Sequence, residues 1–125
     1  MGYRSDVKIV AGKNAAKELR EVNKKYEYLT ETEGENGEWL FECDWIKWYD
    51  DEEDIAAYMD VVNKYMGMEG EDNGIDFMRL GEDSEDVEKY SNYSTVASLC
   101  SGIVVDSFTK KEPKPKPKKP KSAKK

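Results

Sequence analysis

The chain has 125 residues, a formal net charge of −7 and no histidine. That length suits one folded domain around one hydrophobic core. The absence of histidine excludes the commonest general base, the Ser-His and Cys-His nucleophile pairs and most transition-metal sites. The acidic loop at residues 69–74 lacks the alternating ligand spacing of a calcium loop. We therefore expect a protein that is not an enzyme and that uses no metal and no other cofactor.

The charge is divided between two parts of the chain. Residues 110–125 hold nine lysines and one glutamate, a net charge of +8, which leaves −15 for residues 1–109 out of the total of −7. All four prolines lie in the same basic segment. Repulsion between lysines, and the extended structure that proline favours, prevent such a segment from repaying the entropy of ordering. We predict an acidic folded domain at residues 1–109 and a disordered Lys/Pro-rich tail at residues 110–125.

Two further features bear on the compartment in which the protein works. No run approaches the roughly 20 apolar residues that a membrane span needs, and the N-terminus lacks a signal-peptide pattern. We therefore expect the protein to stay in the compartment where it is made. Cys43 and Cys100 lie in apolar segments and lack the close spacing of a redox or zinc motif, which predicts two buried thiols.

The first half of the chain predicts a strand, a helix and a hairpin. Residues 3–10 alternate with the period of a half-buried strand. From Asn14 to Tyr26, apolar residues recur every three or four positions, which predicts a helix of about three turns. Residues 26–33 and 38–48 predict two strands, because Asn36-Gly37 between them favours the positive φ angles of a tight turn.

The second half predicts another helix and more strands. Apolar residues recur with helical period from Ile55 until Gly67 ends the pattern. Residues 75–80 predict a strand, and residues 94–108 predict one or two more around Gly102. The order is β-α-β-β-α-β with an additional C-terminal strand or strand pair. It is typical of an α+β domain of the split β-α-β (ferredoxin-like) type, an antiparallel sheet with two helices on one face.

The hairpin strands predict an acidic surface. If they alternate regularly, five carboxylates point the same way: Glu27, Glu31, Glu33, Glu42 and Asp44. One interpretation is a solvated face that keeps the protein soluble. The other is a decoy for nucleic acid, since such a field repels DNA and attracts proteins that bind it.

Three short strings resemble small uncharacterised proteins of tailed bacteriophages and prophages. They are Gly2-Tyr3-Arg4-Ser5-Asp6-Val7, Trp45-Ile46-Lys47-Trp48-Tyr49-Asp50 and Phe77-Met78-Arg79-Leu80-Gly81-Glu82-Asp83. The resemblance runs from Gly2 to about Glu88, and it implies a phage origin rather than a particular chemistry. It is weak after Tyr90 and does not include the tail, so a function of the tail would be particular to this chain.

The predicted topology brings these three strings together. In a split β-α-β sheet the first strand lies between two later strands and runs opposite to both, so its beginning meets their ends. We name the residues that converge there the recognition edge: Tyr3, Arg4, Ser5, Asp6, Lys47, Trp48, Tyr49, Arg79, Glu82 and Asp83. One interpretation is a structural corner, in which arginines pair with carboxylates and Trp48 covers the core. The other is a binding surface, because aromatic residues and arginine anchor interfaces.

Two functions follow as hypotheses. The first is a non-enzymatic phage accessory protein in the cytoplasm of the infected bacterium, whose acidic domain binds and modulates a host protein, with mimicry of nucleic acid as one form of this function. The alternative is a nucleic-acid-associated protein that holds DNA or RNA by phosphate contacts from its tail. The tail residues are Lys110, Lys111, Lys114, Lys116, Lys118, Lys119, Lys121, Lys124 and Lys125. Neither hypothesis involves a membrane.

Overall fold

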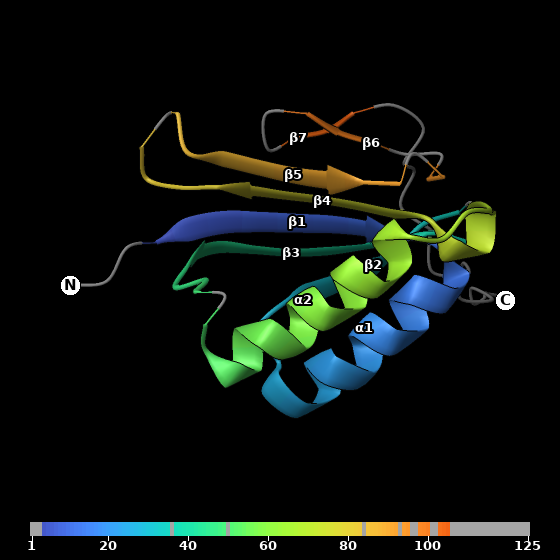
Figure 1. The fold of residues 1–125 in the computed structure, drawn as a ribbon, viewed down its shortest axis with the longest axis horizontal. Helices are drawn as coiled ribbons and strands as arrows, with labels where there is room; N and C mark the ends of the chain where they lie inside the picture. Colours follow the sequence, from blue (N-terminus) through green and yellow to red (C-terminus); the bar gives the residue numbers. More distant parts are fainter. Residues whose placement is uncertain are drawn as a thin grey trace, which may run out of the picture.

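The computed structural model describes most of the chain before residue 96 and two short strands beyond it. The described residues are 4–35, 37–49, 51–83, 85–92 and 94–95, together with the backbone of 98–100 and 103–105. Tyr3 and the predicted tail at residues 110–125 lie outside the described residues. Within them the protein is α+β, and a five-stranded antiparallel sheet in the order β2-β3-β1-β4-β5 packs against two α-helices (Figure 1).

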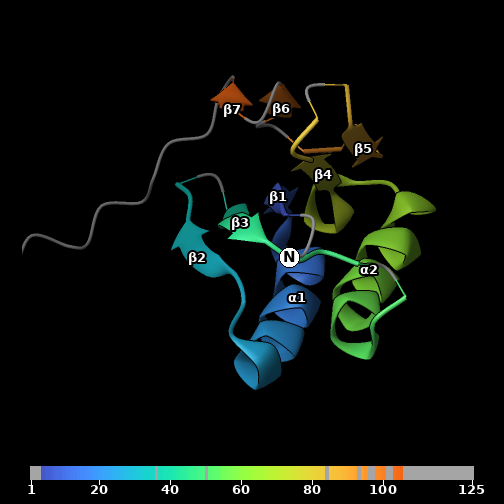
Figure 2. The ribbon, with the colours of Figure 1, turned by 90° about the vertical axis from the view of Figure 1, so that its left-hand side faces the viewer.

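The elements in chain order are β1 (Ser5–Ala11), α1 (Lys13–Tyr26), β2 (Thr30–Glu33), β3 (Trp39–Ile46), α2 (Glu53–Met66), the 3-10 turn η1 (Glu71–Asn73), β4 (Ile75–Leu80), β5 (Val87–Ser91), β6 (Ser98–Cys100) and β7 (Ile103–Val105). Both helices lie on one side of the sheet, and the β6–β7 pair lies on the other side (Figure 2). The predicted α+β class, with both helices on one face, is therefore confirmed.

Strand β1 lies at the centre of the sheet and runs antiparallel to both of its neighbours. Ser5 at its beginning is opposite Ile46 at the end of β3, and Asp6 is opposite Leu80 at the end of β4. The beginning of β1 therefore meets the ends of β3 and β4, which is the convergence on which the recognition edge depends.

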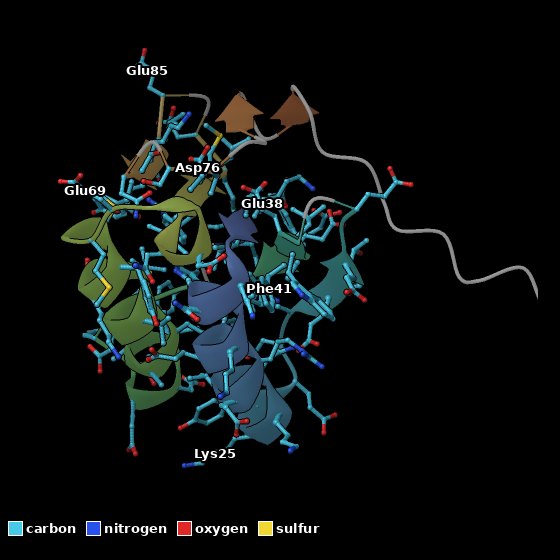
Figure 3. All side chains as sticks on the ribbon, turned by 90° about the vertical axis from the view of Figure 1, so that its right-hand side faces the viewer. Lys25, Glu38, Phe41, Glu69, Asp76 and Glu85 are labelled. Carbon is cyan, nitrogen blue, oxygen red and sulfur yellow. The ribbon has the colours of Figure 1, made fainter. Side chains whose placement is uncertain are left out.

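The main core lies between the sheet and the helices. Val7 and Ile9 alternate with outward residues along β1, and Leu19 of α1 is buried against the same face. Phe41 lies between β3 and α1 (Figure 3). Burial of each such large apolar side chain stabilises the fold by about 1.5–3 kcal/mol, so this face holds most of the apolar stabilisation.

A smaller apolar cluster lies on the opposite face of the sheet. It consists of Val10, Leu40 and Met78, with Leu80 packed against it. Strand β6 contacts β1 and β4, and Asp76 is buried on the same face with Lys89 Nζ 3.8 Å from its Oδ1 (Figure 3). The β6–β7 pair therefore packs near the centre of this face.

The predicted boundaries of the first hairpin strand are wrong. Helix α1 continues to Tyr26, and Glu27 ends it in the left-handed region at φ 59°. The side chain of Asn23 then accepts a hydrogen bond from the Leu29 N–H and donates one to the Leu29 carbonyl. These local bonds hold residues 27–29 as a connection, so β2 begins only at Thr30.

The predicted acidic surface on the hairpin is also wrong. Glu31 is opposite Phe41 and shares its helix-facing side, whereas Glu42 is opposite Thr30 on the other side. Glu31 is engaged there by Arg20 and Asn23, and Glu42 pairs with Lys8. The carboxylates are thus divided between two faces.

Two other expectations have partial outcomes. Cys43 is a free, half-buried thiol rather than a buried one, and burial raises its pKa; the side chain of Cys100 lies outside the described residues. Among the described helices, none has the length and apolar character needed to cross a membrane.

Candidate functional site: the recognition edge

A β-bulge organises the recognition edge. Between the pairs Val7–Cys43 and Ser5–Ile46, β1 supplies only Asp6 while β3 supplies both Asp44 and Trp45. An extra residue of this kind kinks a strand and changes which face the following side chains meet. Cys43 before the bulge and Ile46 after it both pack on the helix side. We call Asp44 and Trp45, opposite Asp6, the Trp45 bulge.

The bulge presents Trp45 to solvent. Its side chain is 62% exposed, and its backbone lies in the left-handed region at φ 61°. That conformation costs a residue with a side chain about 1–2 kcal/mol. Two side chains of the β1 segment hold it: Asp6 Oδ1 accepts from the Trp45 N–H at 2.8 Å, and Arg4 Nη1 donates to the Trp45 carbonyl at 3.4 Å. The backbone that carries the exposed indole is therefore held by its neighbours.

The next tryptophan is turned inward. Trp48 is buried, and its ring centroid lies 5.5 Å from that of Tyr58 and 6.3 Å from that of Phe77. Its indole N–H has no hydrogen-bond acceptor in the described part of the chain, and a buried unsatisfied donor costs about 1–3 kcal/mol. The edge thus carries two local free-energy costs: the left-handed backbone of Trp45 and the unpaired N–H of Trp48. Backbone strain of the first kind clusters at functional sites.

Arg79 is the structural anchor of the edge. Its guanidinium donates to Ser5 Oγ at 2.8 Å and to Asp86 at 2.7 and 3.2 Å, and it also pairs with Glu88. Burial alone would lower the pKa of Arg79, but the hydrogen bonds to Asp86 and Glu88 outweigh it and raise the pKa above its ordinary value. Arg79 therefore stays charged and ties β4 to β1 and β5.

The turn after β4 closes one side of the edge. Glu82 is exposed, and its Oε2 accepts from the Arg4 backbone N–H at 2.7 Å. Asp83 Oδ1 accepts from the Glu85 N–H at 3.0 Å, within the turn itself. Glu82 therefore helps to hold the β1 segment, whereas Asp83 stabilises its own turn.

Two hollows lie on either side of Tyr49 and Glu52. One has a volume of about 580 Å³ and is also lined by Trp48, Arg79 and Asp86. The other, of about 460 Å³, is lined by the residues Arg4, Tyr28, Ile46, Lys47 and Asp54 together with Tyr49 and Glu52. Tyr49, 36% exposed, therefore forms the ridge between them.

The second hollow contains a short hydrogen bond from the Tyr28 hydroxyl to Asp54 Oδ2. This bond, followed by burial, raises the pKa of Tyr28. It also lowers the pKa of the Asp54 carboxyl, with further help from the Ile55 N–H. Asp54 is thus held ionised at the beginning of α2, where its negative charge also favours the helix dipole.

The structure brings together the nine described residues predicted for the edge, but in different roles. Ser5, Trp48, Arg79 and Asp83 serve the fold, as in the interpretation of a structural corner, whereas Asp6 holds the Trp45 bulge. Arg4, Lys47, Tyr49 and Glu82 stay on the surface around the hollows and the turn. Tyr3 lies outside the described residues.

Sequence reasoning missed Trp45 as a member of the site. The signal was present in the run Trp45-Ile46-Lys47-Trp48, whose apolar residues at 45, 46 and 48 cannot all follow one alternation. A change of phase within the run indicates a bulge.

Within the described residues, no three acidic or cysteine side chains cluster closely enough to hold a metal ion. The chain was also compared with protein-family models, curated proteins and solved structures, and none of them matches it. The function must therefore be argued from the geometry of the site.

Proposed function

We propose that the protein is a non-enzymatic bacteriophage accessory protein that binds a protein of the bacterial host through the recognition edge and the Trp45 bulge. One observation carries the proposal: Trp45 is 62% exposed and is held by Asp6 and Arg4 in a backbone conformation that costs energy. The phage origin and the host cytoplasm rest on the resemblance of the three sequence strings. The hairpin carboxylates do not support mimicry of nucleic acid, because they lie on two faces of the sheet.

The chemistry of the edge favours a protein partner. A tryptophan buries roughly 150–250 Å² when it enters an interface, and tryptophan, tyrosine and arginine dominate binding energies. Trp45 and Tyr49 supply two such anchors. Arg4 donates to the Trp45 carbonyl and lines one hollow with Lys47 and Tyr49. Glu82 accepts from the Arg4 N–H, so both signs of charge lie close to the anchors. The expected partner surface has an apolar pocket with a polar rim.

The sheet order supports a finer proposal on the fold. We propose that β1-α1-β2-β3-α2-β4 forms a split β-α-β unit of the ferredoxin-like type, to which β5 adds a strand beside β4. The support is the order β2-β3-β1-β4 with antiparallel neighbours. In this arrangement the recognition edge lies at the end of the sheet where the central strand begins.

The binding proposal can be tested by capture with matched variants. Full-length wild-type protein, Trp45→Gly and Val87→Ala are each immobilised and exposed to host lysate at moderate salt. Val87 is the control, because it is 49% exposed and lies on β5, three positions along the sheet from β3, which carries the bulge. We expect one host protein to be retained by the wild type and by Val87→Ala, and lost with Trp45→Gly. A retained set that Trp45→Gly does not change would refute the proposal.

The basic tail supports a second proposal, that the chain also binds DNA or RNA. Its nine lysines carry the argument, since phosphate neutralisation supplies most non-specific nucleic-acid binding. Replacement of all nine lysines by glutamine in the full-length chain should weaken retention on DNA and reduce its salt dependence, because the phosphate contacts of the tail are lost. Unchanged retention on DNA would refute it.

A further inference from the structure

A cationic hollow lies along α1, away from the recognition edge. It has a volume of about 650 Å³ between α1 and the β2–β3 hairpin. Four cationic residues line its helix wall: Lys13, Lys17, Arg20 and Lys24. Their spacing of four, three and four places them on one face of the helix. We call this hollow the cationic groove.

Three of these four charges are available to a ligand. Arg20 is engaged, because its Nε lies 3.3 Å from Glu31 Oε1 and its guanidinium carbon lies 4.2 Å from the centre of the Trp39 ring. Lys13, Lys17 and Lys24 are exposed, and none has an ion pair in the part of the chain that the structure describes. The groove therefore contains a row of lysines that the fold does not use.

The row stands out against the charge of the rest of the domain. Helix α1 carries five cationic and two acidic side chains, a net charge of +3, within residues 1–109 that total −15. Its first turn holds no acidic residue and its N-cap makes no side-chain hydrogen bond, so the positive end of the helix dipole adds to the row. Only Glu21 and Glu31 oppose it among the residues that line the groove.

We propose that the cationic groove binds the phosphate backbone of a single-stranded nucleic acid. From Lys13 to Lys24 the helix rises about 17 Å, and a nucleic-acid strand carries one phosphate for about every 3.4 Å of duplex axis. A regular row of single charges suits a polymer that carries one charge on every unit. The hollow between α1 and the hairpin favours one strand over the broader duplex.

Binding in the groove is independent of base sequence. The aromatic residue there, Trp39, is stacked with Arg20 and also packs against the core. Its ring is thus already engaged and is a poor platform for a base. Phosphate contacts then supply the affinity, and such contacts weaken steeply as salt rises.

The test uses the full-length chain and a fluorescent oligothymidylate across a salt series. The groove variant combines Lys13→Gln, Lys17→Gln and Lys24→Gln, since glutamine matches lysine in helix propensity. The control variant combines Lys25→Gln, Lys47→Gln and Lys64→Gln, which removes the same charge outside the groove. Both retain the basic tail, so its contribution is the same in each.

The expected result is a change in the salt dependence of the groove variant alone. Each lost phosphate contact reduces the slope of log K against log salt by about 0.7 for single strands, so three lost contacts reduce it by about 2. Glu21→Gln should strengthen binding, because it removes an opposing charge from the groove. Circular dichroism of each variant checks that the helices remain.

Three results would overturn the proposal. The first is an equal slope for the groove and control variants, and the second is no binding of the oligonucleotide by the wild type at low salt. The third is displacement of the oligonucleotide by polyglutamate at equal charge, which would assign the groove to an acidic polypeptide. Trp45→Gly should leave this binding unchanged, so the result is independent of the proposed function of the recognition edge.

Discussion

The two ends of the sheet use their polar groups in opposite ways. At the end where β4 begins, the Asn92 side chain donates to the carbonyls of Tyr65 at 2.9 Å, Met68 at 3.2 Å and Asn73 at 2.8 Å. Its Oδ1 accepts from the Ile75 N–H at 3.0 Å. One side chain thus joins the end of α2, the loop after it and β4. We call this region the closed end.

At the recognition edge, by contrast, polar side chains bind the backbone of an exposed residue. Asp6 and Arg4 bind the backbone of Trp45, whose side chain is exposed, and the buried N–H of Trp48 has no acceptor in the described part of the chain. The closed end therefore stabilises the fold, whereas the recognition edge carries two local free-energy costs, at Trp45 and at Trp48. Substitutions at the two ends should separate stability from binding.

The largest effect is expected for Asn92→Ala at the closed end. The change removes the donor to the Met68 and Asn73 carbonyls and the acceptor of the Ile75 N–H, and each unsatisfied group costs about 1–3 kcal/mol. We expect the free energy of unfolding to fall by about 3 kcal/mol, as measured by urea denaturation. Asn63→Ala on the exposed side of α2 is the matched control and should change stability little. Equal effects for the two variants would remove the distinction between the two ends.

The next effect is expected for Gly74→Ala, also at the closed end. A Cβ at this position would lie 2.9 Å from Thr95 Cγ2 and 3.0 Å from backbone atoms of Ser94 and Thr95. Backbone atoms move less readily than flexible side chains, so we expect a loss of about 2 kcal/mol in unfolding free energy. Gly67→Ala is the control, because a Cβ there meets no atom within 4 Å. An unchanged unfolding free energy for Gly74→Ala would show that the loop adjusts freely.

A smaller and pH-dependent effect is expected for Tyr28→Phe below the recognition edge. The variant loses the hydrogen bond to Asp54, which should cost about 1 kcal/mol at neutral pH. The pKa of Asp54 is lowered first by Tyr28, so this stabilisation is complete above the unfolded pKa and is lost as pH falls through the folded pKa.

The difference in unfolding free energy between wild type and Tyr28→Phe should therefore be constant near neutral pH and shrink below about pH 4. Denaturation curves at a series of pH values measure it. A difference that persists unchanged at low pH would show that the bond does not depend on the ionised carboxylate.

Much of the architecture follows from local patterns in the sequence. Residues 75–80 form a strand as predicted, and the helical period from Ile55 onward corresponds to α2. The predicted strands around Gly102 correspond to β6 and β7. These segments could be predicted because the apolar pattern of each lies within the segment itself and needs no partner distant in the chain.

The features that sequence analysis missed depend on partners distant in the chain. Val87 and Tyr90 of β5 fall on opposite faces, so the strand shows no apolar alternation and becomes a strand only through its pairing with β4. The Trp45 bulge requires Asp6 from β1. The lysine row on α1 is visible in the sequence, but its availability depends on which acidic residues pair with it.

The most direct test of the account is the stability of Trp45→Gly. Glycine removes the cost of the left-handed backbone, about 1–2 kcal/mol, and adds about 0.5–1 kcal/mol of chain entropy. We predict an unfolding free energy equal to that of the wild type or higher by up to about 1.5 kcal/mol, because the proposal assigns Trp45 to binding and not to the fold. A loss of about 2 kcal/mol would contradict it and would show that Trp45 serves the fold.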